Sequence, residues 1–282
     1  MQDEVLSGTQ VGLYDFGARL LDGQHIPAWT SIDPLAEKYY NVSPYVYAAN
    51  NPILYVDRDG REITFSYEWE KDKKGNYVIN KQGGYNLTGV TMHVTGKVIN
   101  VSSNLGVNMN AAAQRISNQI SSTFSGTIGN GVTFSTNINL SVAGSMSDIE
   151  ANDHVFALAD ITNSDVSGAA NQFGGKVAFI DADYFTGWYD TTIGNTGPWT
   201  AAHEFGHLAN LYHTTTRGNL MKSGGTRSNL TDGQLRSIYN SYEKGLLNQG
   251  SNYELEVSYS TGKTVTRRLP NRGLVHPFIK YK

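Results

Sequence analysis

The sequence predicts an α+β fold in which a mixed, twisted β-sheet is covered by a few amphipathic helices. Residues 90–101 and 132–142 alternate apolar and polar side chains, which is typical of strands. Residues 110–124 carry apolar side chains at every fourth position, which is typical of one buried face of a helix. With 282 residues, 39% of them hydrophobic, the chain can bury a sizeable core.

The composition excludes several classes of protein. Lys and Arg number 22 and Asp and Glu 25, so a net charge of −3 offers no basic surface for nucleic acid. No apolar run approaches the ~18 residues that a membrane-spanning helix needs, and the first residues lack the apolar stretch of a Sec-type signal peptide. The absence of cysteine excludes disulfides, thiolate metal sites and cysteine nucleophiles. The remaining chemistry belongs to His, carboxylate and hydroxyl groups.

Changes in composition divide the chain into three parts. Residues 1–60 are rich in Tyr, Pro and Asp, which predicts short strands joined by tight turns. Residues 61–250 are rich in Asn, Ser, Thr and Gly and contain every predicted helix. Residues 251–282 form a tail, in which 253–269 predict a hairpin around Ser260-Thr261-Gly262.

The central part predicts strands and helices in a mixed order. Residues 63–69 and 77–80 predict a hairpin around a turn at 73–76. The other predicted strands are 90–101, 132–142, 154–161 and 176–180, and the predicted helices are 110–124, 198–209 and 231–247. Pro198 is a favoured first residue of a helix. Thr231 and Gln234 have the spacing of a capping box.

The first 60 residues resemble the C-terminal end of the RHS/YD-repeat core of large bacterial polymorphic toxins and surface proteins. The resemblance rests on YDFGAR at 14–19, the block at 29–40 that ends in IDPLAEKYY, and SPYVYAANNP with VDRDG within 43–60. It implies that the residues that follow are a variable effector module. In the family, aspartates near this end can cut the chain, and Asp33 and Asp57 occupy comparable places; the alternative is that both simply form turns.

The residues that carry chemistry lie in the predicted helix 198–209. His203 and His207 are four positions apart, so they are about 40° apart around the helix axis and roughly 6 Å apart along it. Two imidazoles can therefore converge on one metal ion. Glu204 lies about 100° from His203 around the axis, where it can reach a water on that metal and act as a general base. Zinc suits an open site of this kind.

The third histidine of this segment, His213, requires the helix to stop. In a continuous helix it would lie about 240° round from His207 and ~9 Å further along. Asn210 is the expected end of the helix, because Asn tolerates the left-handed backbone conformation that terminates helices. A turn at Asn210 would bring His213 back to the same metal.

Residues 203–213 resemble the metzincin zinc-peptidase motif H-E-x-x-H-x-x-G-x-x-H, with Asn210 at the usual glycine. The resemblance covers about residues 90–247 in the order of elements. It implies a metzincin-like fold and one zinc ion on His203, His207 and His213, with Glu204 as the general base of an endopeptidase. Metzincins also carry a methionine turn beneath the metal, and Met221 is the candidate, as packing support rather than a ligand. Some members have a Tyr two residues after this Met, where this sequence has Ser223.

Other interpretations stay open. A zinc peptidase of the gluzincin type would take its third ligand from a later helix, where Glu243 is the candidate. A non-catalytic RHS-type surface or adhesion protein is the alternative from another class. Asp181 and Asp183 could hold a structural calcium ion, although two carboxylates alone equally suit a turn. The isolated histidines His25, His93, His154 and His276 are interpreted as surface or core residues.

The predicted partners follow from the two resemblances. A zinc peptidase would take a protein or peptide substrate, and strand 154–161 is the expected sheet edge for an extended peptide. The RHS resemblance implies a toxin-like effector with a neutralising immunity protein, exported or delivered to a target cell. Neither resemblance implies nucleic-acid binding or a membrane span.

Overall fold

The computed structural model describes residues 63–163, 165–186, 196–223, 229–260, 263–271 and 279–280, together with Ser43 and four short strands before residue 30. The chain divides into two compact units, Met1–Arg61 and Glu62–Lys282. Asp33, Asp57, His25 and His276, which the sequence singled out, lie outside the described residues.

The first unit contains the short strands that its composition predicts. They form one antiparallel sheet in the order β1-β2-β3-β4. Their bounds are Asp3–Leu6, Thr9–Asp15, Leu20–Asp22 and Ala28–Trp29. Most of the residues that resemble an RHS core lie after Trp29 and are not described, so that resemblance stays a prediction.

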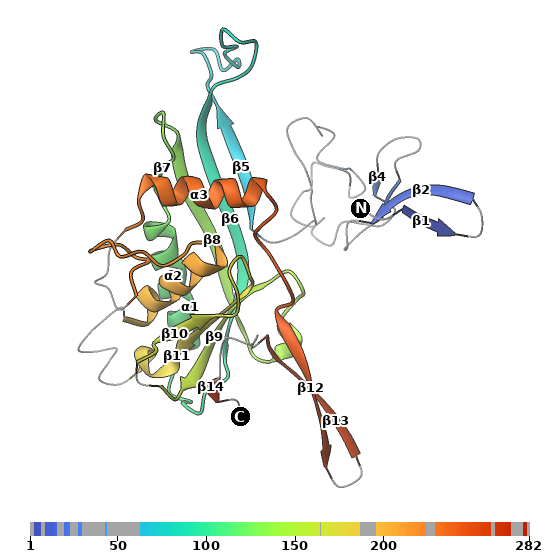
Figure 1. The fold of residues 1–282 in the computed structure, drawn as a ribbon, viewed down its shortest axis with the longest axis vertical. Coiled ribbons are helices and arrows are strands. Elements are labelled where there is room, and N and C mark those ends of the chain that lie inside the picture. The colour runs from blue at the N-terminus through green and yellow to red at the C-terminus, as the bar shows by residue number, and fades with distance from the viewer. Residues whose placement is uncertain are drawn as a thin grey trace. The chain divides into compact units, whose positions relative to one another are not determined.

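The second unit is built on a mixed eight-stranded sheet (Figure 1). Its main order is β10-β11-β9-β6-β8-β7, with β5 paired to β6 and β14 paired to β9. The bounds are β5 Thr64–Trp69, β6 Leu87–Asn100, β7 Gly126–Thr127, β8 Thr133–Ala143, β9 His154–Ile161, β10 Gly168–Ala170, β11 Val177–Asp181 and β14 Ile279–Lys280. The strands β6, β8, β9 and β11 run parallel, and the others are antiparallel to their neighbours.

Three helices pack against one face of this sheet: α1 Met109–Thr123, α2 Thr196–Leu208 and α3 Asp232–Glu243 (Figure 1). The predicted apolar positions of α1 are all buried, and they join a single large core with the inner faces of α2 and the sheet. Strand β9 shows that both faces of the sheet are covered by apolar residues. Its Phe156 and Leu158 belong to the core under the helices, and Val155 and Ala157 belong to a smaller cluster on the opposite face. The predicted α+β class is confirmed.

The third helix begins as predicted and ends early. Thr231 is its N-cap, and the capping box with Gln234 is formed in both directions. The helix ends at Glu243, four residues before the predicted end. Gly245 has φ +65°, a left-handed conformation that glycine adopts without a steric penalty and that turns the chain out of the helix.

The predicted hairpin of residues 63–69 and 77–80 is formed only next to its turn, where Lys71 pairs with Tyr77 and the Val78 N–H donates to the Glu70 carbonyl at 3.0 Å. Strand β5 itself pairs with β6, and Ile79 forms an isolated bridge to Tyr85. The turn itself is present, because Asp72 accepts hydrogen bonds from the backbone of Lys74 and Asn76. Packing decides the pairing: Phe65 of β5 is buried among aromatic rings of the core, which a local hairpin would not supply.

The tail hairpin is confirmed. It consists of β12 Tyr253–Ser260 and β13 Lys263–Pro270 in antiparallel register. Its base is attached to the sheet domain, because the Asn252 amide donates to the Asp153 carbonyl at 2.9 Å and the Arg268 guanidinium donates to the Ile149 carbonyl at 3.3 Å. None of the helices in the described residues is long and apolar enough to cross a membrane.

Candidate metal centre

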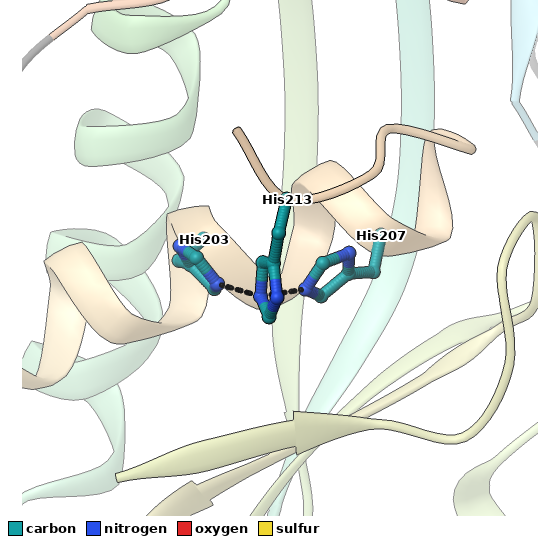
Figure 2. Close-up of side chains that lie close together, drawn as sticks. All are labelled: His203, His207 and His213. Carbon is teal, nitrogen blue, oxygen red and sulfur yellow. Dashed lines mark hydrogen bonds between the residues drawn. The ribbon is translucent and has the colours of Figure 1, made fainter. Parts of the chain in front are cut away.

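Three histidine side chains meet beside helix α2 (Figure 2). His203 and His207 project from the helix, and His213 reaches between them from the loop that follows. The Nε2 atom of His213 lies 3.1 Å from Nε2 of His203 and 3.1 Å from Nε2 of His207. One nitrogen from each ring lies within 4.8 Å of the other two. Among the described residues, no other group of His, Asp and Glu is arranged to hold a metal ion.

The helix ends where this convergence requires. Asn210 has φ +63°, the left-handed conformation that terminates a helix. The next backbone N–H, of Leu211, donates back to the Gly206 carbonyl at 2.8 Å, which closes the turn. The Asn210 amide also donates to the Ser241 hydroxyl of α3 at 3.1 Å. The reversed chain then carries His213 back to the other two rings.

Backbone carbonyls determine the protonation of two of the rings. Nδ1 of His203 lies 2.7 Å from the Leu220 carbonyl, and Nδ1 of His207 lies 2.8 Å from the Leu211 carbonyl. Because a carbonyl oxygen can only accept, both Nδ1 atoms carry the proton and both neutral rings present an Nε2 lone pair. His213 Nε2 lies 3.1 Å from the Nε2 lone pairs of both rings, and it can donate a proton to only one of them. In the other contact two nitrogen lone pairs would face each other, which is unfavourable unless a cation lies between them.

The donor set fits zinc. A tetrahedral zinc ion bonded to imidazole nitrogens at about 2.05 Å separates those nitrogens by about 3.3 Å. The two separations of 3.1 Å are close to that value. Three imidazoles leave a fourth position open, which is the arrangement of catalytic rather than structural zinc sites.

Burial keeps two of the rings neutral, which is the form that binds a metal. It lowers the pKa of His203, an effect that the Leu220 carbonyl opposes. It lowers the pKa of His207 to about 4, and again the hydrogen bond, here to Leu211, opposes the change. Charge on neighbouring imidazoles lowers both pKa values further.

Glu204 is buried between α2 and the sheet, with 6% of its surface exposed. Burial raises its pKa to about 8, and a hydrogen bond from the backbone N–H of Ala170 on β10 opposes this rise. A glycine permits the close approach of β10 to the helix. A Cβ atom on Gly168 would lie 2.6 Å from the Thr200 methyl carbon and 3.0 Å from Glu204 Cγ.

Met221 is fully buried against the same helix. A Cβ atom on Gly206, the residue before His207, would lie 2.3 Å from the Met221 sulfur. The Met221 carbonyl accepts from Thr214 N at 3.0 Å, which joins the methionine to the residue after His213. The structure thus places Met221 as packing against helix α2, and its side chain belongs to the hydrophobic core.

One part of the site could not be read from the sequence: an amide pair between Asn219 and Gln234. The Asn219 amide donates to Gln234 Oε1 at 2.7 Å, and Gln234 Nε2 donates to Asn219 Oδ1 at 3.0 Å. Asn219 Oδ1 also accepts from the backbone N–H of Met221 at 2.9 Å. This amide pair fixes the loop whose Leu220 carbonyl orients His203. The capping-box spacing identified Gln234, but it carried no sign of a partner 15 residues earlier.

The other candidates lie apart from the histidines. Glu243 accepts a hydrogen bond from the Tyr67 hydroxyl at 3.0 Å and is not part of the metal-holding group. Asp181 is the N-cap of a short 3-10 helix, Ala182–Phe185, and accepts from Asp183 N at 3.0 Å, which supports the turn interpretation. His93 is hydrogen-bonded to the Ser66 hydroxyl at 2.8 Å.

The predicted peptide-binding edge is wrong. Strand β9 is interior to the sheet, between β11 and β6, and the edge strand beside the centre is the short β10. The apolar run of β9 is buried on both faces, which is typical of a central strand. Three small residues, Gly168–Ala170, gave no comparable strand pattern in the sequence.

Comparisons with known proteins give structural likenesses only. No protein-family model matches the chain, and no curated protein matches it. Among solved structures, archaemetzincin from Methanopyrus kandleri is 12% identical, with a TM-score of 0.39, and the match covers 54% of this chain and 96% of that one. Metalloproteinase-II from Bacteroides fragilis is 12% identical, with a TM-score of 0.35, and the match covers 55% of this chain and 54% of that one.

Proposed function

We propose that the chain is a zinc-dependent endopeptidase with its active site on helix α2. The observation that carries the proposal is the convergence of three Nε2 atoms, two of which are lone-pair donors by virtue of their Nδ1 hydrogen bonds. A buried carboxylate, Glu204, follows the first of these histidines directly in the helix. Three imidazoles and one adjacent carboxylate are what metal-assisted hydrolysis of an amide requires.

The roles of the residues follow from their positions. His203, His207 and His213 would hold the zinc ion. When bound, zinc supplies a Lewis acid that polarises the substrate carbonyl and lowers the pKa of a water molecule toward ~7. Glu204 takes the proton from the attacking water and delivers it to the leaving amine.

The substrate is proposed to bind as an extended peptide along β10. In the described part of the chain, β10 is the end of the sheet and pairs with a strand on one side only. Edge strands accept a further strand through their backbone groups. The hydrogen bond from Ala170 N–H to Glu204 places this edge directly beside the proposed general base.

Metal stoichiometry and proteolysis test the proposal together. Purified protein is expected to hold one zinc ion per chain and to cleave an unstructured protein such as casein, with activity lost on chelation and restored by zinc. Glu204→Gln should abolish cleavage and keep the zinc ion. His93→Gln is the matched control, since His93 binds Ser66 and lies outside the group of three histidines. Wild-type protein without zinc and without cleavage would refute the proposal.

Two variants separate the gluzincin-type alternative from this proposal. If Glu243 were the third ligand, His213→Ala would keep its zinc ion and Glu243→Gln would lose it. The contacts favour the opposite result, because His213 Nε2 lies 3.1 Å from both other imidazoles whereas Glu243 is hydrogen-bonded to Tyr67.

The toxin role is a separate proposal that rests on the motifs of residues 1–60. We propose that the peptidase is delivered to a target cell as an RHS-associated effector and is neutralised by an immunity protein. Expression of residues 62–282 in a bacterial host tests this: growth should stop with the wild-type sequence and continue with Glu204→Gln. Normal growth with active, zinc-loaded protease in the cells would contradict it and would favour an RHS-type surface protein.

A further inference from the structure

We propose that Phe173 and Tyr212 form a substrate subsite that selects a large apolar or aromatic side chain close to the scissile bond. The inference rests on the proposed peptidase function and adds the substrate class. The two rings are stacked, with centroids 4.3 Å apart and planes inclined by 24°. Both are exposed in spite of their apolar faces, Phe173 by 46% and Tyr212 by 64%.

The stacked pair is attached to the metal centre. Phe173 lies edge-on against the ring of His207, with centroids 5.1 Å apart and planes at 88°. Tyr212 directly precedes His213 in the chain. The backbone N–H of Gly174 donates to the His207 carbonyl at 2.9 Å, so the loop that carries Phe173 is hydrogen-bonded to the end of α2.

The loop of Phe173 is held in place on both sides. Asn171, which is buried, accepts from Val177 N at 3.1 Å through its side chain. The Gly174 carbonyl accepts from Gln249 N at 2.7 Å, and a Cβ atom on Gly174 would lie 2.0 Å from the Leu246 carbonyl oxygen. A fixed loop presents the two rings as a preformed surface, which lowers the entropy cost of binding.

The position of the pair relative to β10 determines which part of a substrate reaches it. Phe173 follows Ala170, the last residue of β10, by three positions, in a turn that brings its ring against His207. A peptide that pairs with β10 beside Glu204 would therefore bring a side chain within three residues of the scissile bond to the rings. Exposed aromatic faces bind apolar and aromatic groups.

Cleavage of a peptide library tests the subsite. The cleavage sites of wild-type protein, mapped by mass spectrometry, should show enrichment of Phe, Tyr, Leu and Met at one position within three residues of the cut. Tyr212→Ser should lower kcat/KM for a peptide with Phe at that position by about tenfold or more, and leave a peptide with Ser there nearly unchanged. Tyr77→Ser is the matched control, since Tyr77 is 51% exposed and contacts the ring of Tyr85.

Two further variants separate the subsite from a structural role. Phe173→Leu keeps an apolar side chain and should keep the preference, whereas Phe173→Ser should lose it. Zinc content and thermal unfolding are measured for each variant, and if Phe173→Ser loses zinc because it contacts His207, the exposed Tyr212 carries the test. Peptide binding to the Glu204→Gln protein, followed by fluorescence anisotropy, should show the same preference without turnover.

The outcomes distinguish the two proposals. Cleavage with no apolar enrichment, or with an enrichment that Tyr212→Ser leaves intact, would overturn the subsite and leave the peptidase standing. Absence of both zinc and cleavage would overturn the peptidase proposal itself. Loss of the preference in Tyr212→Ser, with zinc content and cleavage of the Ser peptide retained, would support the subsite.

Discussion

The Asn219–Gln234 amide pair offers a quantitative test of how α3 supports the metal centre. In Gln234→Glu, the carboxylate can still accept from Thr231 N and from the Asn219 amide, as Gln234 Oε1 does at 3.0 Å and 2.7 Å. The donor to Asn219 Oδ1, now at 3.0 Å, is replaced by a second acceptor. Asn219 cannot rotate its amide to compensate, because Oδ1 also accepts from Met221 N at 2.9 Å.

The expected loss of stability in Gln234→Glu follows from the burial of Asn219. Asn219 is only 4% exposed, so opposing its carbonyl with an acceptor costs about 1–3 kcal/mol of unfolding free energy. A negative charge in the first turn of α3 returns about 0.3–1 kcal/mol. The midpoints of the two ranges leave a net loss of about 1.4 kcal/mol, which corresponds to a decrease in Tm of roughly 3–6 °C for a domain of this size. Because the same loop carries the Leu220 carbonyl that orients His203, zinc affinity should fall about tenfold.

The measurements are thermal unfolding of the metal-free protein and zinc competition against a chromophoric chelator. Thr231→Ala is the control, since it removes the hydroxyl that accepts from Gln234 N but leaves the amide pair in place. It should cost about 1 kcal/mol of stability and leave zinc affinity unchanged. If Gln234→Glu binds zinc as tightly as wild type, the proposed support of His203 by this pair is wrong.

Three other predictions concern packing, metal and pH. Gly206→Ala should lower the unfolding free energy in urea by about 1–3 kcal/mol, because the new Cβ would lie 2.3 Å from the Met221 sulfur. A double-mutant cycle with Met221→Ala should show strong coupling between the two positions. Zinc at about 100 times its Kd should raise the unfolding free energy by about 2.7 kcal/mol, and chelation should reverse this; equal Tm values with and without zinc would argue against a metal centre. Burial, and secondarily the charge of Lys176, lower the pKa of His154 from 6.5 to about 3. As the pH falls, His154 therefore gains its proton in the unfolded chain before it does in the folded one. The unfolding free energy should decrease from pH 6.5 toward pH 3 by at most ~1.4 kcal/mol per pH unit. His154→Phe should flatten that slope in urea titrations.

Long regular elements could be predicted from the sequence because their apolar periodicity reflects their own geometry. Helix α1 and strands β6, β8 and β9 lie within a few residues of their predicted bounds. The helix-ending turn at Asn210 and the capping box of Thr231 were readable for the same reason, since each depends on residues close together in the chain. Pairing partners were less predictable: β5 was assigned to a local hairpin, and the sheet edge was assigned to β9.

The sequence by itself predicted the fold class and the three histidines that the fold brings together. Two local properties carried this prediction: the four-residue spacing of His203 and His207 on one helix, and the tolerance of Asn210 for positive φ before the third histidine. Neither requires knowledge of the sheet. Only the tertiary structure decided which strand lies beside Glu204, which ring stacks on Tyr212, and which side chain holds Asn219. Each of these contacts joins residues far apart along the chain, and they form because burial of apolar surface brings α2, β10 and α3 together.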